Sequence, residues 1–169
     1  DSSTITLFVD IFKGGGLKLH TKMPMSGFVP DLVHISEAAC NDKDFLGQLN
    51  VESGAVYIFN KGYVNYTVWQ EWTKQEVFYV TRLNENAVHQ VLGGTVNHPA
   101  DYANGGILSD QRILLNCSLE SRLVIFKDYV RGKVLKFVSN MFDHHTTIVQ
   151  LYKYRWNIEV LFKIRLKCP

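Results

Sequence analysis

The chain has 169 residues, of which 46% are hydrophobic and 20% are charged, and its formal net charge at pH 7 is +2. These values are ordinary for a soluble globular protein and allow one domain with a real core, while so small a net charge does not prove a nucleic-acid partner. No apolar run approaches the length of a membrane span and no signal-peptide pattern opens the chain, so the sequence predicts no transmembrane helix.

The cysteines and the ends of the chain indicate its context. Cys40, Cys117 and Cys168 are odd in number and far apart, which predicts reduced thiols in a cytosolic protein and not a disulfide framework or a zinc site. The chain has no initiator methionine, and Asp1 comes directly before a strand-like segment. We therefore expect a fragment of a longer protein.

The first half of the chain alternates between strand and helix patterns. Alternating apolar residues predict strands over 4–12, 17–23 and 28–36, followed by a short helix over 42–49. The continuous apolar run over 55–59 is typical of a strand that is buried on both faces and leads to a functional edge. An amphipathic helix over 63–75, with Trp69 and Trp72 on its inner face, and a buried strand over 76–82 follow.

The second half of the chain differs in composition and pattern, because its glycines are clustered and its apolar segments are short and strand-like. These runs predict strands over 87–92, 111–117, 122–128 and 133–138, which together form a mostly β insertion over 84–140. A helix is predicted from about Thr146 to the C-terminal region. The whole order predicts an α/β fold, in which helices flank the faces of a mixed sheet.

The terminal helix combines an apolar stripe with polar side chains at helical spacing. Tyr152, Arg155 and Glu159 are separated by three and then four residues, so they share one face. Glu159 is the one acid among five basic residues: Lys153, Arg155, Lys163, Arg165 and Lys167. This excess of positive charge is consistent with a polyanionic partner, although a solvated basic face remains the alternative.

Acidic residues at the ends of buried strands are candidates for a metal site. Carboxylate oxygens bind hard cations such as Mg²⁺, and sites for phosphoryl transfer share such ligands between two ions. Asp1 begins the first strand and Glu159 lies on the last helix, but Asn60 follows the central strand where an aspartate is expected. Asp10, Asp42 and Asp44 are possible substitutes for this aspartate, but none of them is expected at the end of the central strand.

Six short motifs in order give the chain a family resemblance. It resembles the catalytic domain of bacterial insertion-sequence transposases of the DDE type, which have an RNase H-like fold. The resemblance covers essentially the whole chain. The matching segments are 1–4 (DSST), 16–21 (GLKLHT), 39–42 (ACND), 59–63 (FNKGY), 137–140 (FVSN) and the spaced residues Tyr152, Arg155 and Glu159.

The resemblance implies both an architecture and a set of functional residues. It implies an RNase H-like mixed sheet flanked by helices, with a core over 1–83 and 141–169 and the β-rich insertion over 84–140. Asp1, Asn60 and Glu159 would occupy the three catalytic positions and bind Mg²⁺ or Mn²⁺. The residues that would contact DNA are Tyr152, Arg155 and Lys163.

The resemblance also implies partners and a location. Double-stranded DNA, as transposon ends and target, would be the substrate, and a homodimer is expected in the synaptic complex. The expected location is the bacterial cytoplasm, in association with the nucleoid and without a membrane partner.

Two departures from the family pattern leave the function open. Asn60 replaces the second catalytic aspartate, and Leu166 stands where the family has a lysine. One interpretation is a transposase domain with impaired chemistry, and another is an inactive DNA-binding remnant. A third is a small-molecule enzyme or interaction domain whose motif matches are accidental.

Of the histidines, His20 and His34 are predicted to be hydrogen-bonded near the sheet.

Overall fold

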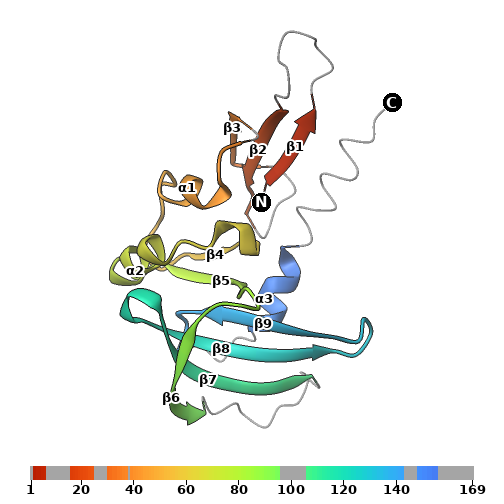
Figure 1. Cartoon of the computed structure of the whole chain (residues 1–169). Helices are drawn as coiled ribbons and strands as arrows, with labels where there is room; N and C mark the ends of the chain where they lie inside the picture. Colours follow the sequence, from red (N-terminus) through yellow and green to blue (C-terminus); the bar gives the residue numbers. More distant parts are fainter. Residues whose placement is uncertain are drawn as a thin grey trace.

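The computed structural model of the chain describes residues 2–6, 16–24, 30–37, 39–95, 106–142 and 148–155. Within these residues, two sheets and three short α-helices form a mixed α/β structure (Figure 1). The expected α/β class is therefore confirmed. No helix in these ranges is long and apolar enough to cross a membrane.

The smaller sheet has three antiparallel strands near the N-terminus. They are β1 (Ser2–Thr6), β2 (Gly16–Lys22) and β3 (Leu32–Glu37), with β2 in the centre. Ser2 pairs with His20 on one side of β2, and His20 pairs with His34 on the other side. All three predicted strands are present here, although parts of the predicted ranges (residues 7–12 and 28–29) lie outside the described residues.

The larger sheet has six strands in the order β4-β5-β9-β8-β7-β6. β4 and β5 are parallel, and the other neighbours are antiparallel. Val80 of β5 pairs with Ser139 of β9, so the strands of the predicted insertion continue the same sheet. The strand bounds are β4 (Val56–Ile58), β5 (Phe78–Arg82), β6 (His89–Thr95), β7 (Ile107–Leu115), β8 (Leu119–Asp128) and β9 (Lys133–Ser139).

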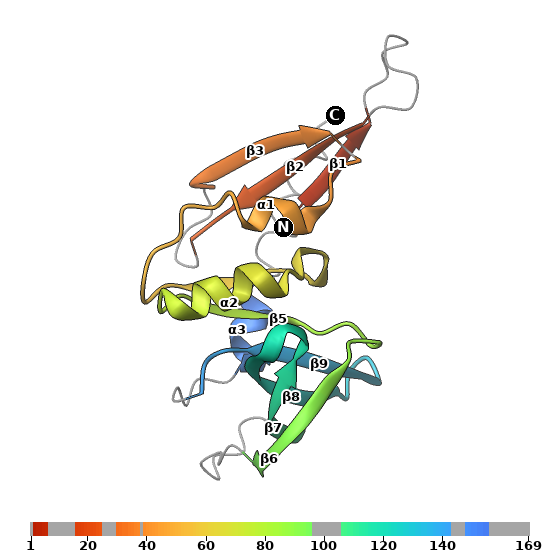
Figure 2. The ribbon, with the colours of Figure 1, turned by 60° about the vertical axis from the view of Figure 1, so that its left-hand side comes forward.

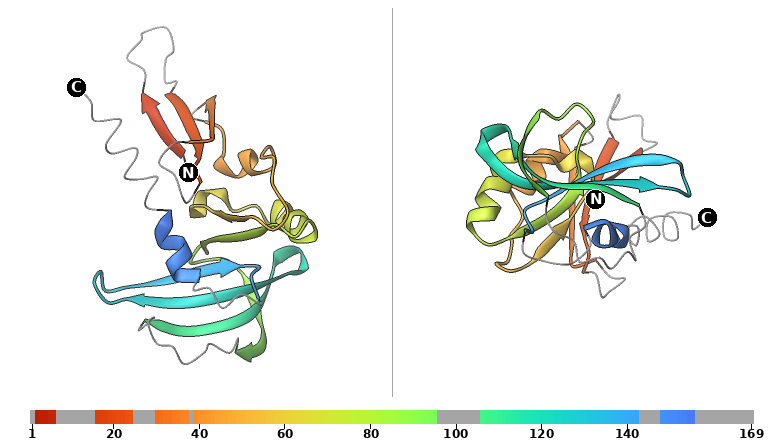
Figure 3. Two further views of the ribbon diagram at one scale, coloured as in Figure 1. Left: turned by 180° about the vertical axis from the view of Figure 1, so that it is seen from behind. Right: turned by 90° about the horizontal axis from the view of Figure 1, so that it is seen from below.

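Two helices cover opposite faces of the larger sheet (Figure 3). Trp69 and Trp72 of α2 (Tyr66–Lys74) pack in one cluster with Tyr79, as predicted for these tryptophans. On the other face, α3 (Ile148–Tyr154) packs in a cluster with Val80. Adjacent residues of β5 thus point to opposite faces, as the pleat of a strand requires.

The short helices lie between the two sheets. α1 (Asp42–Leu46) lies between the three-stranded sheet and α2, and the 3₁₀ turn η1 (Lys61–Tyr63) follows β4 (Figure 2). The predicted helix over 63–75 begins later than expected, because the side-chain oxygen of Asn65 caps α2 by accepting from the Val68 amide. The helix predicted over 42–49 ends at Leu46.

The expectation that the strand over 55–59 is buried on both faces is wrong. Val56, Tyr57 and Ile58 are only half-buried. Among the described residues β4 is an edge strand of its sheet, and it borders a cavity of about 310 Å³. The residues of the apolar run therefore line this cavity on one side and pack against the core on the other.

Candidate active site

The end of β4 is fixed by hydrogen bonds to the neighbouring strand. The Phe59 amide donates to the carbonyl oxygen of Val80 at 3.2 Å, and the Thr81 hydroxyl donates to the carbonyl oxygen of Phe59 at 2.8 Å. The Phe59 side chain is only 5% exposed in the aromatic core. The backbone directly before Asn60, the expected central residue of the site, is therefore held in a fixed position.

Asn60 and Gly62 shape the turn that follows β4. The Asn60 side-chain oxygen accepts a hydrogen bond from the Gly62 amide at 2.8 Å and so caps η1. A Cβ atom on residue 62 would lie 2.7 Å from Oδ2 of Asp42 and 3.0 Å from Oδ1 of Asn60. A carboxylate oxygen and an amide oxygen therefore pack closely against residue 62, which is possible because this residue is a glycine.

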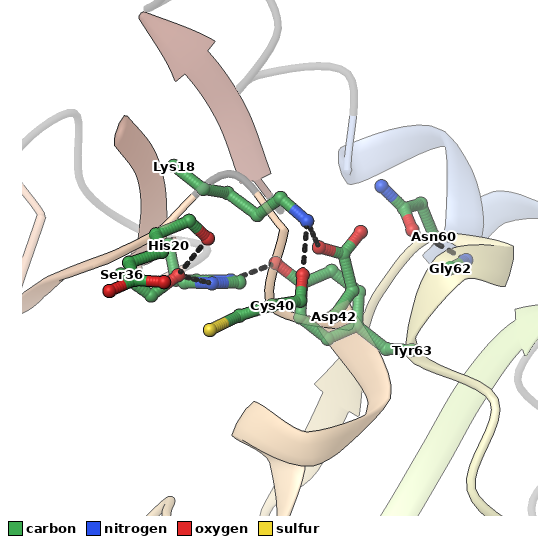
Figure 4. A network of polar contacts seen from close by, with 9 residues as sticks. Lys18, His20, Ser36, Cys40, Asp42, Asn60, Gly62 and Tyr63 are labelled. Atoms are coloured by element: carbon green, nitrogen blue, oxygen red, sulfur yellow. Dashed lines mark hydrogen bonds and ion pairs between the residues drawn. The ribbon is translucent and has the colours of Figure 1, made fainter. Parts of the chain in front are cut away.

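Asp42 lies at this point although it is far from β4 in the sequence. In Figure 4 its carboxylate lies between the Lys18 side chain and Asn60. The Lys18 ammonium is 3.0 Å from Oδ1 of Asp42 and donates to the carbonyl oxygen of Cys40 at 2.6 Å. Asp42 begins α1 and does not belong to the central strand, as expected, but α1 packs against η1 and so brings the Asp42 carboxylate beside the turn that follows β4.

His20 connects the smaller sheet to the same turn. Its Nδ1 lies 2.9 Å from the Tyr63 hydroxyl oxygen, and its Nε2 lies 3.0 Å from the Ser36 hydroxyl oxygen. The Phe45 ring stacks on the imidazole at a centroid distance of 4.4 Å. Burial lowers the pKa of His20 below its usual value of 6.5. The prediction that this histidine is hydrogen-bonded near the sheet is confirmed.

The C-terminal end of α3 approaches β4 from the other side. Tyr154 and Arg155 line the cavity of about 310 Å³ together with Tyr57 and Phe59. The Arg155 guanidinium carbon lies 5.2 Å from the centre of the Tyr152 ring. Tyr152 is 8% exposed and belongs to the core cluster that covers this face of the sheet. The structure thus brings Arg155 near the end of the central strand. The Tyr152 ring is part of the core that holds α3 against the sheet.

The other predicted site residues are not placed. Asp1, Glu159 and Lys163 lie outside the described residues, so the convergence of Asp1, Asn60 and Glu159 stays a prediction. Within the described ranges, no three His, Cys, Asp or Glu side chains are grouped closely enough to hold a metal ion.

Comparison with known proteins decides the family. The family model described as "Transposase DDE domain" matches residues 13–167. The chain belongs to this transposase family. It is also 29% identical over 154 residues to "Putative transposase y4zB" from Sinorhizobium fredii (strain NBRC 101917 / NGR234). That alignment covers 88% of the chain and 43% of the relative, so the chain spans less than half of the relative's length.

Three sequence motifs of this DDE domain meet around residue 60. Lys18 and His20 come from the segment 16–21, Asp42 from 39–42, and Gly62 and Tyr63 from 59–63. Their contacts join β2, α1 and η1 into one unit. Sequence reasoning missed these pairings, but the presence of all three motifs in one chain was a signal that their residues belong together.

A fourth motif, the segment 137–140, stabilises the larger sheet next to the site. Asn140, the last residue of the segment 137–140, accepts a hydrogen bond from the Tyr79 amide at 2.9 Å. Its side-chain nitrogen donates to the carbonyl oxygen of Val77 at 2.9 Å and to the hydroxyl of Thr73 at 3.0 Å. Asn140 therefore ties the end of β9 to the start of β5 and to α2, which explains a polar residue at a position that is only 6% exposed.

The described donors at the end of β4 are suited to a hard cation. DDE transposases as a family use divalent metal ions, and such ions prefer oxygen ligands. The described oxygen donors near the end of β4 include the Asp42 carboxylate, which pairs with Lys18, and the Asn60 amide, which accepts the Gly62 amide. The chemistry of these two donors fits the kind of ion that the family uses, although the described residues alone do not form a metal site.

Proposed function

We propose that this chain is the catalytic domain of a DNA transposase, with Mg²⁺- or Mn²⁺-dependent strand cleavage and strand transfer at transposon ends, and that Asn60 impairs this chemistry. The observation that carries the proposal is the intact packing around residue 60. The Lys18–Asp42 and His20–Tyr63 contacts hold the turn in place, while the Asn60 side chain at its centre is neutral.

The residues of the site would divide the work. A divalent cation, when bound, would supply Lewis-acid assistance to phosphodiester cleavage. Asp1 and Glu159 would hold it through carboxylates, and Asn60 through its amide oxygen. Because an amide carries no charge, Asn60 would hold a cation more weakly than an aspartate and would not bridge two ions as an anion. Water would cleave the phosphodiester at the transposon end and leave a 3′-hydroxyl on the transposon and a 5′-phosphate on the flanking DNA. This 3′-hydroxyl would then attack a phosphodiester of the target and release a 3′-hydroxyl of the target strand.

DNA binding would rely on the end of α3. The guanidinium of Arg155 is suited to paired hydrogen bonds with a phosphate, and Lys163 and the Tyr152 hydroxyl would add further contacts. Arg155 lines the cavity beside Phe59, so a phosphate bound there would lie near the end of β4. The substrate would be double-stranded DNA, and the protein would act as a homodimer in the synaptic complex. Its location would be the bacterial cytoplasm.

An inactive DNA-binding remnant is the second candidate. The Asn60 oxygen already accepts the Gly62 amide, and the nearby Asp42 carboxylate already pairs with Lys18. A chain in which neither group binds a cation would keep the fold and the basic helix without the reaction.

The test compares the parent chain with Asn60→Asp on a supercoiled plasmid that carries the inverted repeats flanking the gene. We expect Mg²⁺-dependent nicking to rise by at least about 10-fold in the variant, because even groups that only support a metal ligand change activity by about 10- to 100-fold. Asn65→Asp is the matched control, because it adds a carboxylate at the cap of α2 and should leave nicking unchanged.

The other outcomes separate the alternatives. Equal nicking by the parent and Asn60→Asp would show that the account of the defect is wrong. Salt-dependent binding of the repeat DNA without nicking by either protein would favour the remnant. Absence of both binding and nicking would contradict both candidate functions, although the chain would remain a member of the family by its sequence.

A further inference from the structure

Arg82 is a partly buried cation at the end of β5. Its Nε atom is shielded from solvent and has no hydrogen-bond partner, and its guanidinium forms no ion pair within the described part of the chain. A guanidinium stays charged, and a partly buried one without a counter-charge destabilises the fold, so such a group indicates a site for an anion. We propose that Arg82 binds a phosphate of the DNA substrate and positions it beside residue 60. This inference rests on the proposed function, because it adds a substrate contact to that same site.

The register of two parallel strands places Arg82 beside Asn60. Ile58 pairs with Val80, and the Phe59 amide still donates to the Val80 carbonyl oxygen at 3.2 Å. Asn60 keeps an extended backbone, with φ of −79° and ψ of 167°, so the same register continued by two residues joins positions 60 and 82. Because neighbouring strands lie about 5 Å apart, the backbone of Arg82 is one strand spacing from the expected central residue of the site.

The two side chains belong to the same face of the larger sheet. Ile58 and Val80 pack in the core cluster that includes α3, whereas Phe59 packs in the cluster on the opposite face. Because side chains alternate along an extended strand, positions 60 and 82 point to the α3 face as well. α3 itself packs against β5 (Figure 1). Residues of β4, β5 and α3 therefore meet on this face.

The row of side chains that crosses the sheet from Arg82 offers no counter-charge nearby. It continues through Phe137 and Val124 to Asp110. Asp110 is three strands away, which corresponds to about 14 Å. Its carboxylate already accepts a hydrogen bond from Arg122 at 2.7 Å. Within the described part of this row, the charge of Arg82 is therefore available to a ligand.

A phosphate group fits this position by its charge and its geometry. The planar guanidinium donates paired hydrogen bonds to phosphate oxygens, which a lysine ammonium cannot do in the same way. Arg155 lines the cavity beside Phe59, so a second guanidinium approaches the end of β4 from α3. Cations from two different elements can hold one DNA strand at two points and so fix its direction across residue 60.

The experiment measures binding of a labelled duplex of the inverted repeat to the 169-residue chain by fluorescence anisotropy at several salt concentrations. We expect Arg82→Gln to bind roughly tenfold more weakly, the scale for losing a hydrogen bond between charged groups. The slope of log affinity against log salt concentration should fall by about one unit. Arg82→Lys keeps the charge without the planar group, so it should keep the slope but not the full affinity.

Arg112→Gln is the matched control for these substitutions. Arg112 is an arginine of the same sheet, but it pairs with Glu120 at 3.2 Å and is half exposed. Its replacement should leave both the affinity and the slope unchanged.

Urea unfolding of the same variants separates a DNA contact from a structural role. Because Arg82 has no counter-charge among the described residues, Arg82→Gln should unfold at a urea midpoint no lower than that of the parent. A residue that only holds the fold together would give the opposite pair of results, which is a lower midpoint with unchanged DNA affinity.

Three results would overturn the inference. The first is an affinity and a slope of Arg82→Gln that equal those of the parent, and the second is a parent chain that does not bind the duplex at low salt. If Arg82→Gln does not fold, Arg82→Lys serves in its place. Binding by Arg82→Lys as tight as binding by the parent would then reject the paired contact with a phosphate.

The failure of this inference is distinguishable from the failure of the proposed function. If the parent nicks the plasmid with Mg²⁺ and Arg82→Gln binds and nicks equally well, the function stands and the role of Arg82 fails. If Arg82→Gln binds more weakly with a smaller slope, but neither the parent nor Asn60→Asp nicks the plasmid, the phosphate contact stands and the proposed chemistry fails.

Discussion

The Nδ1 atom of His20 lies 2.9 Å from the hydroxyl oxygen of Tyr63, which joins the smaller sheet to the turn that carries Asn60. The two side chains are 1% and 2% exposed. The other ring nitrogen of His20 contacts the Ser36 hydroxyl, so both nitrogens of the imidazole have partners inside the protein. A contact between residues that are 43 positions apart thus sets the distance between β2 and the end of β4.

Tyr63→Phe should destabilise the fold, because the substitution leaves a nitrogen of His20 buried without its partner. A buried polar group that loses its hydrogen bond costs about 1–3 kcal/mol in the free energy of unfolding. Urea unfolding of parent and variant measures this difference. Tyr129→Phe is the control, since Tyr129 is 65% exposed and should change stability by less than about 0.5 kcal/mol. Equal midpoints for the parent and Tyr63→Phe would contradict the role of this contact.

The stability of the fold should fall in mildly acidic solution through His20. Burial is the largest cause of its lowered pKa, and the attraction of Asp42 opposes it. Because the folded pKa lies below 6.5, the unfolded chain binds more protons between these two values, and the free energy of unfolding rises with pH there. The contribution is complete above 6.5 and is lost as the pH falls toward the folded pKa.

The pH prediction is checked by urea midpoints from about pH 8 to about pH 5 for the parent and for His20→Gln. The variant cannot gain a proton at this position, so its midpoint should decrease less than that of the parent over this range. Parallel pH profiles for the two proteins would exclude His20 as the source of the decrease.

A buried ion pair in the larger sheet should matter more for stability than an exposed one. Arg122 donates to both carboxylate oxygens of Asp110, with the shortest contact at 2.7 Å, and the exposures of the two residues are 2% and 1%. Arg122 also donates to the carbonyl oxygen of Met141, just after β9. Asp110→Asn should cost about 3–5 kcal/mol, because it leaves a buried guanidinium without its counter-charge.

The exposed pair in the same strands is the control for this prediction. Glu120 lies 3.2 Å from Arg112, and both side chains are about half exposed (47% and 50%). Glu120→Gln should therefore change the free energy of unfolding by less than about 1 kcal/mol. Chemical denaturation measures both substitutions, and similar costs for Asp110→Asn and Glu120→Gln would contradict the importance of burial here.

Arg155→Ala should weaken DNA binding and make it less dependent on salt. A side chain that neutralises one phosphate contributes about one unit to the slope of log affinity against log salt concentration. Fluorescence anisotropy with a labelled repeat duplex measures affinity and slope together. Arg131→Ala is the control, because Arg131 lies in the turn between β8 and β9 and not on α3. An unchanged slope in Arg155→Ala would remove this residue from the DNA contact.

The sequence predicts the strands and helices well where one periodic pattern dominates. The four strands over 89–139 and the pair Trp69 and Trp72 follow from alternation and helical spacing, which local sequence encodes directly. The partner of each strand is not encoded locally. The pairing of β5 with β9 joins Val80 to Ser139 across a long segment, and it depends on packing against both faces of the sheet.

The candidate site was predictable only in part for a related reason. Asn60 could be identified because it directly follows an apolar run that resembles a family motif. Asp42 could not, because its place beside Asn60 depends on the way α1 packs on η1 and on the contact with Lys18. A carboxylate that reaches a strand end from another element leaves no signal in the spacing of residues along the chain.

Gly62→Ala tests this arrangement with the smallest possible change. Gly62 has no backbone conformation that excludes alanine, so the cost must come from space. The new methyl group would lie 2.7 Å from the Asp42 carboxylate and 3.0 Å from the Asn60 amide, and one of these side chains must move. We expect a loss of about 1–3 kcal/mol in the free energy of unfolding, as for other overpacked positions.

The matched control and the rescue for Gly62→Ala both come from the same region. Gly47→Ala adds a methyl group whose nearest neighbour, the Val68 side chain, is 3.7 Å away, so urea unfolding should show little change. Asp42→Ala removes the carboxylate that the new methyl group would meet, so Gly62→Ala should cost less in that background than in the parent. Equal costs in the two backgrounds would mean that the Asp42 carboxylate does not pack against Gly62. A smaller cost in the Asp42→Ala background would show that it does so in solution, because only neighbouring side chains couple in this way.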